Sequence, residues 1–269
     1  MNQRPPIVLV FAGSDPTGGA GIEADILTLA SLGCRAAPVV TAVTVQDTAG
    51  VHEFHAVDTE IVIAQARAVL EDMPIAAIKT GMLAQAETVS AIATIANSYP
   101  DLPLIVDPVL ASGSGQELST DPLEDAYRSM LLPLAKLITP NTIEARRLAS
   151  QGDSLDACAQ ELLAFGCEKV LITGTHAQSK NIQHKLYGRS GIEECFEVDR
   201  LPDTYHGSGC TLASACAAGF AHGIDDVDCI GHALYYTQQT LKHGYRAGMG
   251  QHLPHHLYWA EDVRTRLKD

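Results

Sequence analysis

Short apolar runs alternate along the chain with longer segments in which apolar residues recur at helical spacing. The run at 7–12 is continuous and ends at Gly13, which is typical of a strand buried on both faces. Similar runs predict strands at 38–45, 51–57, 76–79, 104–106, 137–139, 170–173, 185–188 and 194–198. The segments between them predict helices at 22–32, 58–70, 87–96, 121–132, 143–149, 155–165, 208–222 and 227–245. This alternation indicates an α/β fold with a mostly parallel central sheet and helices on both faces, in a single domain over residues 1–269.

Charge and cysteine content limit the function classes that are open to such a chain. The sequence has 18 Lys plus Arg against 32 Asp plus Glu, a net charge of -14, which argues against a nucleic-acid partner. It has 7 cysteines without C-x-x-C spacing and no H-E-x-x-H motif, so neither a zinc site nor a disulfide framework is expected. The run at 7–12 is too short for a signal peptide or a membrane span. We therefore expect a cytoplasmic protein with no membrane partner.

The residues that follow the predicted strands are small or polar, which suits a ligand site at the carboxyl edge of the sheet. Gln46 is one of them, and its amide offers one acceptor and two donors, as the edge of an aminopyrimidine requires. Met82, Val109 and Gln46 could instead belong to the core, where Met more often fills a gap than contacts a ligand, so Gln46 is the better functional candidate.

A glycine-rich loop at 13–21 connects the first strand to the first helix. Its last part matches G-x-G-x-x-A, but a loop of six residues separates it from the strand, and no lysine follows the glycines as a P-loop requires. The glycines instead predict a backbone that approaches a small ligand closely. The helix beyond the loop has Ile22, Ile26, Leu29 and Ala30 on the face that we expect to be buried. Asp25 in its first turns could complement the helix dipole or accept a hydrogen bond from a ligand, and both interpretations stay open.

A second glycine-rich stretch at 206–212 precedes a helix of small residues. Glycines at a helix start allow successive N–H groups to converge on an anion, such as a transferring phosphoryl group. Cys210 lies within the first turn, where a helix lowers the pKa of a thiol. A buried, inert cysteine is the alternative, and His206 nearby raises a third possibility, a Cys/His nucleophilic hydrolase.

Oxygen-bearing side chains follow two further strands, with Asp107 after one and Asn141 and Glu144 after the other. Taken singly, Asp107 could form a turn and Glu144 could be an acid in the first turn of a helix. Together with an anion-binding helix start, they indicate Mg²⁺ held along with nucleotide phosphates.

The ordered set of motifs resembles the hydroxymethylpyrimidine/phosphomethylpyrimidine kinases of thiamine biosynthesis, in the ribokinase-like superfamily. The matching segments are AGSDPTGGAGIEAD at 12–25, TAVTVQ at 41–46, KTGM at 79–82, VDPV at 106–109, TPNTIE at 139–144 and HGSGCT at 206–211. The resemblance covers nearly the whole chain. Cysteine at position 210 is similar to the pyrimidine branch, because most sugar and nucleoside kinases of the superfamily carry aspartate there.

The resemblance implies phosphorylation of 4-amino-5-hydroxymethyl-2-methylpyrimidine and then of its monophosphate, with ATP and Mg²⁺, by a homodimer. It also implies a role for each motif residue. The pyrimidine pocket would be formed by Gly13, Asp25, Gln46, Met82 and Val109. The anion hole would be formed by Gly207, Ser208, Gly209 and Cys210, with Cys210 at the position of the presumed base. Mg²⁺ would be held by Asp107 and Glu144, and the nucleotide and its phosphates by Asn141, Thr173, Thr175 and His176.

The chain departs from the family pattern at two places. Ser208 stands where threonine is usual, which is a mild change because the backbone N–H groups bind the anion. The segment 110–115, LASGSG, lacks the lysine that many members carry in their lid, and this changes how charge on the transferring phosphate would be neutralised. Two alternative functions keep the same fold: a pyridoxine or pyridoxal kinase with the same machinery, and a non-catalytic sensor that binds the pyrimidine.

Overall fold

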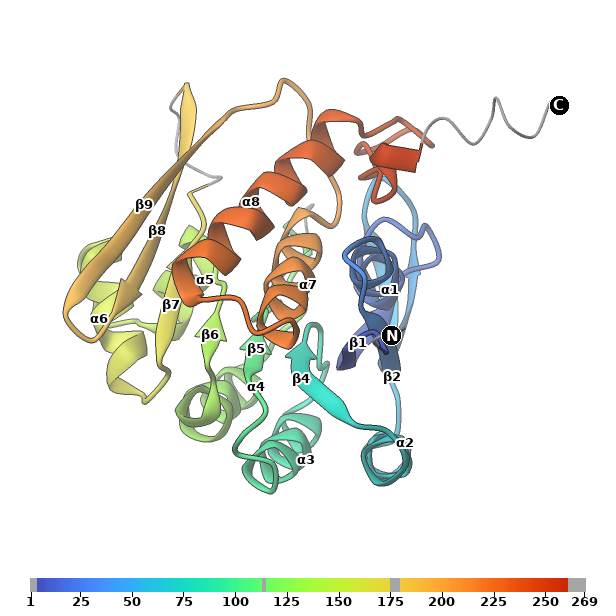
Figure 1. Cartoon of the computed structure of the whole chain (residues 1–269), viewed down its shortest axis with the longest axis vertical. Helices are drawn as coiled ribbons and strands as arrows, with labels where there is room; N and C mark the ends of the chain where they lie inside the picture. Colours follow the sequence, from blue (N-terminus) through green and yellow to red (C-terminus); the bar gives the residue numbers. More distant parts are fainter. Residues whose placement is uncertain (1–3, 113–114, 175–179, 261–269) are drawn as a thin grey trace, which may run out of the picture.

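The computed structural model describes residues 4–112, 115–174 and 180–260 and contains one nine-stranded sheet (Figure 1). The strand order is β3-β2-β1-β4-β5-β6-β7-β8-β9. The neighbouring strands β2, β1, β4, β5, β6 and β7 pair parallel to one another. At one edge β3 pairs antiparallel with β2, and at the other edge β8 pairs antiparallel with both β7 and β9. The strands are β1 (Ile7–Ser14), β2 (Arg35–Gln46), β3 (Val51–Ala56), β4 (Ile75–Thr80), β5 (Leu104–Val106), β6 (Leu137–Ile138), β7 (Lys169–Ile172), β8 (Asn181–Gly188) and β9 (Gly191–Asp199). The predicted α/β fold is confirmed.

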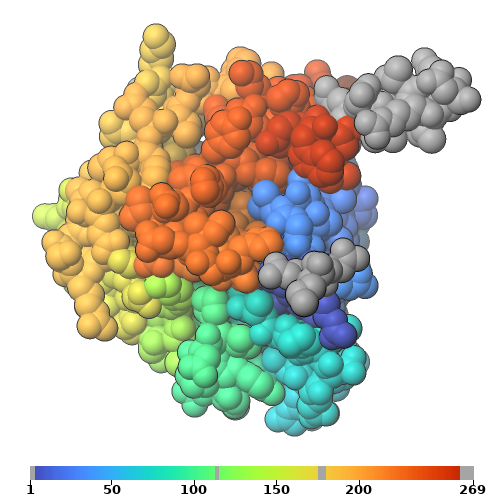
Figure 2. All heavy atoms as spheres, in the orientation of Figure 1, coloured from blue at the N-terminus to red at the C-terminus, as the bar shows by residue number. Residues whose placement is uncertain are grey.

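Helices cover both faces of the sheet. They are α1 (Gly21–Ser31), α2 (Thr59–Asp72), α3 (Ala86–Asn97), α4 (Asp121–Ala126), α5 (Thr142–Leu148), α6 (Leu155–Ala164), α7 (Ser208–Ala221) and α8 (Asp226–Lys242). The buried residues of α1, α7 and α8 share one apolar cluster with strand residues, and those of α2 to α6 share another on the opposite face. In Figure 2 the orange α7–α8 segment covers the near face, with the cyan α2–α3 segment below it.

The sheet reverses its direction of growth between β1 and β4. The chain passes from β1 through α1 to β2 on one side, and from β4 through α3 to β5 on the other. Crevices at such a switch point lie beyond the carboxyl ends of the strands and commonly hold ligands. The ends of β1, β4 and β5 therefore define the edge at which to look for a site.

The buried face of α1 differs from the prediction. Ile22 and Leu29 are buried as expected, but Ile26 is 38% exposed and Ala30 is also exposed. Asp25 and Thr28 lie on the buried face instead, and Asp25 has no exposed surface. The polar residue is buried because the sheet beneath it supplies a lysine partner, which the apolar pattern of the helix alone does not reveal.

Two helix ends also differ from the prediction. Residues 121–132 form α4 and then a π turn over Tyr127–Leu131, and a 3₁₀ turn containing Pro133 follows over Leu132–Leu134. Proline lacks the N–H that a continuing helix needs. The last long helix, predicted to reach 245, ends at Lys242, and Tyr245 pairs with Leu253 in an antiparallel bridge. Among the described residues, no helix combines the length and the apolar character that crossing a bilayer would require.

Candidate active site

The first glycine-rich loop is organised by the carboxylate of Asp15, which is 1% exposed. It accepts hydrogen bonds from the Thr17 N–H (2.8 Å), the Thr17 hydroxyl (2.8 Å) and the Ala20 N–H (2.8 Å). Burial raises the pKa of Asp15, but hydrogen bonds from His206 and Thr17 outweigh this effect and lower it. Asp15 is thus an anion at neutral pH that holds its own loop in shape. Sequence reasoning did not single it out.

The second glycine-rich loop packs directly against the first. His206 Nε2 lies 2.9 Å from Asp15 Oδ2. Gly207 has a φ of +72°, and a β-carbon there would lie 1.9 Å from the carbonyl oxygen of Gly19. Only glycine fits this left-handed close approach. His206 is therefore engaged by the first loop, and this geometry disfavours the Cys/His hydrolase.

The predicted anion hole lies at the start of α7, where Gly207 is the N-cap residue. Gly209 is exposed and Cys210 is partly buried, so the first turn is open to a ligand. Four N–H groups at a helix start lack partners within the helix, and they attract an anion. The structure thus places Gly207, Ser208, Gly209 and Cys210 in the N-cap and first turn of α7.

The expectation of a lowered Cys210 pKa is wrong. Burial raises the pKa of the thiol, and the nearby Asp107 carboxylate raises it further. The positive charge of Lys79 and a hydrogen bond from the Gly21 N–H oppose this rise but do not reverse it. Burial, together with the nearby carboxylates of Asp107 and Asp25, therefore sets the direction of the Cys210 pKa. Cys210 is therefore a neutral thiol at rest.

Four of the five residues predicted for a pyrimidine pocket lie at the ends of β1, β2, β4 and β5. A β-carbon at Gly13 would lie 3.3 Å from Met82 Sδ. Met82 and Val109 belong to one apolar cluster, which also contains Val51, and Val51 pairs with Gln46. Gln46 and His206 also line one small cavity, so Gln46 lies beside the second glycine loop. The apolar cluster and the amide would together enclose a flat, polar-edged ring.

Asp25, the fifth of these residues, lies behind the loops and forms a fully buried ion pair. Lys79 Nζ lies 2.8 Å from Asp25 Oδ1, and both side chains are 0% exposed. The Ser214 hydroxyl donates to the same oxygen at 2.6 Å. Sequence reasoning missed Lys79 as a functional candidate. Two signals could have found it: a charged residue inside an otherwise apolar strand, and its place at the start of the KTGM motif at 79–82.

Asp107, Asn141 and Glu144 meet at the ends of β5 and β6. Asn141 and Glu144 form a capping box on α5, in which the Asn141 amide oxygen accepts from two N–H groups and Glu144 accepts from the Asn141 N–H at 2.9 Å. Burial raises the pKa of Glu144 to about 8, and the charge of Asp107 contributes. Burial also raises the pKa of Asp107 to about 6. Two acidic groups thus share a nearly buried space at the strand ends.

The remaining nucleotide candidates are only partly described. Thr173 is 8% exposed and forms a parallel bridge with Asn141, so these two lie together at the ends of β6 and β7. Thr175 and His176 lie outside the described residues.

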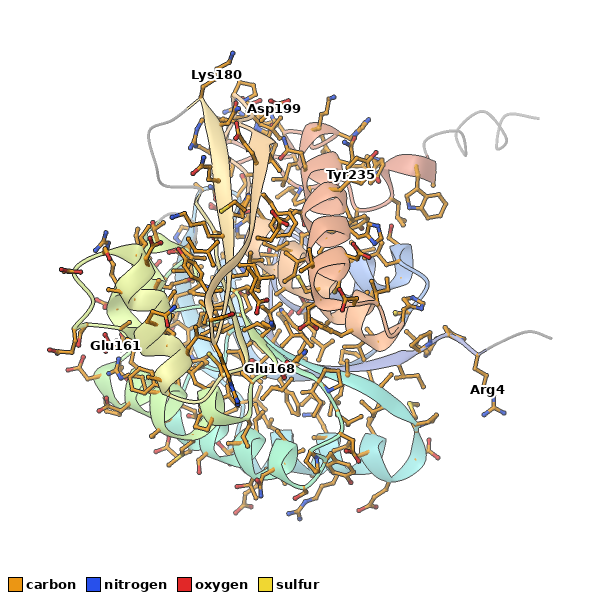
Figure 3. The ribbon with its side chains drawn as sticks, turned by 60° about the vertical axis from the view of Figure 1, so that its left-hand side comes forward. Arg4, Glu161, Glu168, Lys180, Asp199 and Tyr235 are labelled. Atoms are coloured by element: carbon orange, nitrogen blue, oxygen red, sulfur yellow. The ribbon has the colours of Figure 1, made fainter. Side chains whose placement is uncertain are left out.

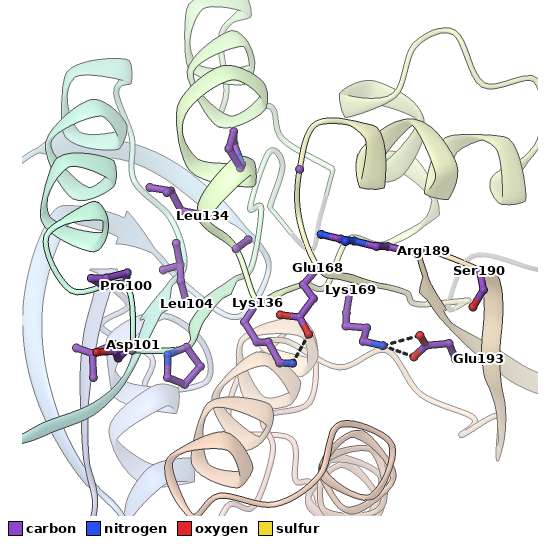
Figure 4. Close-up of a pocket in the computed structure, with 15 residues that line it drawn as sticks. Pro100, Asp101, Leu104, Leu134, Lys136, Glu168, Lys169, Arg189, Ser190 and Glu193 are labelled. Carbon is purple, nitrogen blue, oxygen red and sulfur yellow. Dashed lines mark hydrogen bonds and ion pairs between the residues drawn. The ribbon is translucent and has the colours of Figure 1, made fainter.

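A pocket of about 620 Å³ lies at the other end of the sheet (Figure 4). It is lined by Leu104, Lys136 and Lys169, at the starts of β5, β6 and β7. Lys136 forms an ion pair with Glu168, and Lys169 forms one with Glu193. Lys180 precedes β8 and lies at the end of the sheet where β7 ends. Figure 3 shows Glu168, which lines the pocket, far from Lys180 and thus far from the carboxyl ends of the strands. None of the predicted site residues lines this pocket.

Comparison with known proteins gives a family and a fold. The model of the phosphomethylpyrimidine kinase family matches residues 15–256. A hydroxymethylpyrimidine/phosphomethylpyrimidine kinase from Mycobacterium bovis is 42% identical, over 91% of this chain and 92% of that protein. A bifunctional thiamine biosynthesis protein from Geobacter sulfurreducens is 36% identical over 99% of this chain and 56% of its own length. Staphylococcus aureus pyridoxal kinase in complex with AMP-PCP superposes with a TM-score of 0.87 at 25% identity, covering 96% of each chain.

Proposed function

The chain belongs to the phosphomethylpyrimidine kinase family, and we propose that it phosphorylates 4-amino-5-hydroxymethyl-2-methylpyrimidine and then its monophosphate in thiamine biosynthesis. It is a phosphotransferase that uses ATP.

The contact between the two glycine-rich loops is the observation that supports this function most directly. Gly207 packs against Gly19, so the start of α7 lies against the loop that borders the cluster of Gly13 and Met82. A hydroxymethyl group on a ring in that cluster would face the N–H groups of Gly209 and Cys210. This is the arrangement that in-line phosphoryl transfer requires, because its catalysis rests mainly on positioning and charge stabilisation.

The pyrimidine would lie between Met82 and Val109, with the Gln46 amide at its polar edge and the Gly13 backbone against its face. Asp25 belongs to this site through the loops that it supports. Its carboxylate has no exposed surface in this conformation, so we propose that it shapes the pocket from behind.

Cys210 would act as a neutral thiol beside the substrate hydroxyl. The thiol donates a hydrogen bond to Asp107, and this bond opposes the effect of burial on the pKa of Asp107. A thiol that keeps its proton at rest takes none from the substrate before transfer begins. A loose transition state needs little early deprotonation, so the main task of Cys210 is to orient the hydroxyl. The N–H groups of residues 207–210 would stabilise the charge on the phosphoryl group.

The residues at the ends of β5 and β6 fit Mg²⁺. Asp107 Oδ2 is buried without a hydrogen-bond partner among the described residues, and burial together with the charge of Asp107 raises the pKa of Glu144. Hard oxygen ligands of this kind suit Mg²⁺ that is also bound by water and phosphate oxygens. No group of three His, Cys, Asp or Glu that could hold a metal by itself occurs within the described parts of the chain. Mg²⁺ would supply positive charge to the phosphates, with Asp107 and Glu144 as its protein ligands.

The nucleotide would lie along the ends of β6 and β7. The Asn141 amide oxygen is used by the helix cap, so its amino group is the part free to reach a phosphate. Thr173 lies beside it, and Thr175 and His176 would continue the same edge.

We further propose a cytoplasmic homodimer. All seven cysteines are free, as in a reducing compartment. Val43 and Val45 project from one face of β2 and are 52% and 50% exposed, which suits a face covered by a second copy. Sedimentation equilibrium tests the dimer.

The deciding experiment measures ADP release with MgATP and three acceptors in parallel: the hydroxymethylpyrimidine, its monophosphate and pyridoxal. We expect turnover on both pyrimidines. Turnover on pyridoxal alone would keep the fold and the mechanism but overturn the substrate. Tight pyrimidine binding without ADP release would identify a sensor instead.

A further inference from the structure

Lys79 is a fully buried cation directly beneath the site. It is the penultimate residue of β4, and the carbonyl of Thr80, the last residue of that strand, accepts a hydrogen bond at 2.9 Å from the backbone N–H of Asp107. A β-carbon at Gly81 would lie only 2.9 Å from Lys79 Nζ. The ammonium therefore occupies the space just behind the point where β4 reaches the active-site edge.

Asp25 connects this cation to two helices. Its Oδ1 accepts from Lys79 on β4 at 2.8 Å and from Ser214 on α7 at 2.6 Å, while Asp25 itself belongs to α1. The three side chains have no exposed surface. One carboxylate oxygen thus joins the sheet to the two helices that begin at the two glycine-rich loops.

Ser214 stands four residues after Cys210 in α7, so the two lie one above the other on the same side of the helix. Fixing Ser214 fixes the turn that carries Cys210 and the anion-binding N–H groups. A displacement of about 1 Å in such a turn can slow a reaction by about 10²-fold.

We propose that Lys79 is a positioning residue for phosphoryl transfer, which holds the first turns of α7 against β4 through Asp25 and Ser214. This inference rests on the proposed function and adds to it. Lys79 touches neither substrate, because it has no exposed surface. It acts by keeping Asp25 in the one orientation that also receives Ser214.

The positive charge of Lys79 is essential to its contact with Asp25. Burial lowers the pKa of Lys79, but the charges of Asp25 and Asp107 and the hydrogen bond to Asp25 raise it by more, so the ammonium remains charged. Apolar residues of similar volume often replace a buried ion pair without loss of stability. They would fill the same space but would leave Ser214 without an acceptor. Stability and positioning can therefore be separated by mutation.

The test compares Lys79→Met, Ser214→Ala and the double variant Lys79→Met/Asp25→Leu with the wild-type protein. Urea unfolding gives stability, steady-state kinetics give kcat and both KM values, and hydrogen exchange gives the protection of residues 208–214. We expect Lys79→Met to lower kcat by about 10- to 10²-fold while KM for ATP stays within about twofold. We also expect faster exchange in the first turns of α7. Ser214→Ala, which keeps the ion pair, should show the same pattern to a smaller degree.

The double variant decides between positioning and simple stabilisation. We expect it to regain much of the stability that Lys79→Met loses, but neither kcat nor the protection of residues 208–214. Recovery of kcat together with stability, or unchanged exchange in folded Lys79→Met, would overturn the inference. If Lys79→Met does not fold, the double variant and Ser214→Ala carry the test. If the wild-type protein releases no ADP with the pyrimidine, the proposed function fails, and the exchange data still report on Lys79.

Discussion

His206 Nε2 lies 2.9 Å from Asp15 Oδ2 and joins the two glycine-rich loops across 191 residues of chain. Asp15 belongs to the loop after β1, and His206 immediately precedes the Gly207 N-cap of α7. The contact holds the loop that borders the proposed pyrimidine pocket against the loop that would bind the phosphoryl group. Both halves of the site therefore depend on one buried carboxylate.

Asp15→Asn should destabilise the protein in a pH-dependent way. The folded pKa of Asp15 lies below its ordinary value, so its carboxylate stabilises the fold above the unfolded pKa of about 3.9, and this contribution disappears as pH falls through the folded pKa. We expect a loss of about 1–3 kcal/mol at pH 7 that shrinks below about pH 4. Urea unfolding across this range measures it. Asp101→Asn, at an exposed position, is the control and should change stability little. A loss for Asp15→Asn that is independent of pH would contradict the assignment.

Asp25→Ala should destabilise the fold before it affects substrate binding. It leaves the Lys79 ammonium buried without its partner, at a cost of about 3–5 kcal/mol. The control is Asp125→Ala, which removes an exposed partner of Arg128 and should cost less than about 1 kcal/mol. Denaturant unfolding compares the two variants. A stable Asp25→Ala protein with a raised KM for the pyrimidine alone would restore Asp25 as a direct substrate contact.

Local patterns predicted the architecture well. Continuous apolar runs located the strands, because a strand covered on both faces leaves little choice of residue. The glycine clusters located both loops of the site, since each loop requires a backbone conformation or a close approach that excludes side chains. These signals depend on a few neighbouring residues, and a sequence displays them directly.

The buried charges could not be predicted in the same way. Lys79 and Asp25 are 54 residues apart, and each looks like an ordinary residue until the fold brings them together. The same applies to Cys210, whose position in a first helical turn indicated a lowered pKa while Asp107 and burial raise it. Pairings between distant elements, and the desolvation that accompanies them, depend on the complete fold.

Gly207→Ala should disable the enzyme, whereas Gly223→Ala should not. Both glycines flank α7 with nearly equal angles, φ +72° and φ +75°, so strain of about 1–2 kcal/mol is common to both variants. Only the β-carbon at Gly207 would collide with the Gly19 carbonyl, since nothing lies within 4 Å of the one at Gly223. We expect kcat to fall by at least about 10² for Gly207→Ala. Equal kcat values for the two variants would show that the contact between the loops is dispensable.

Cys210→Ala should lower kcat by less than about 10², the lower limit of what a general base typically contributes. The reason is the raised pKa of the thiol, which keeps it protonated at neutral pH. Cys210→Ser, which keeps a hydrogen-bonding group, should retain more activity than Cys210→Ala. Steady-state kinetics with saturating ATP and pyrimidine measure both variants. A larger loss for Cys210→Ala, unaccompanied by unfolding, would assign proton transfer to this thiol.

Glu144→Gln should stabilise the metal-free protein at high pH while it lowers activity. The pKa of Glu144 is raised to about 8, from about 4.3 in an unfolded chain, so the folded protein loses stability as pH rises between these values. Glutamine removes this charge and can still complete the capping box on α5. We expect the variant to match the wild type near pH 5 and to exceed its melting temperature by several degrees at pH 8.

Added Mg²⁺ should narrow the difference in melting temperature between Glu144→Gln and the wild type at pH 8. A bound cation stabilises the ionised carboxylate of the wild type more than it stabilises the neutral amide of the variant. Thermal unfolding with and without Mg²⁺ at pH 5 and pH 8 measures both effects. Glu60→Gln, at an exposed first-turn position of α2, is the matched control and should show no such dependence. If Mg²⁺ raises the melting temperature of Glu144→Gln and of the wild type equally, Glu144 is not a ligand. The metal would then be held by Asp107 and the phosphates alone.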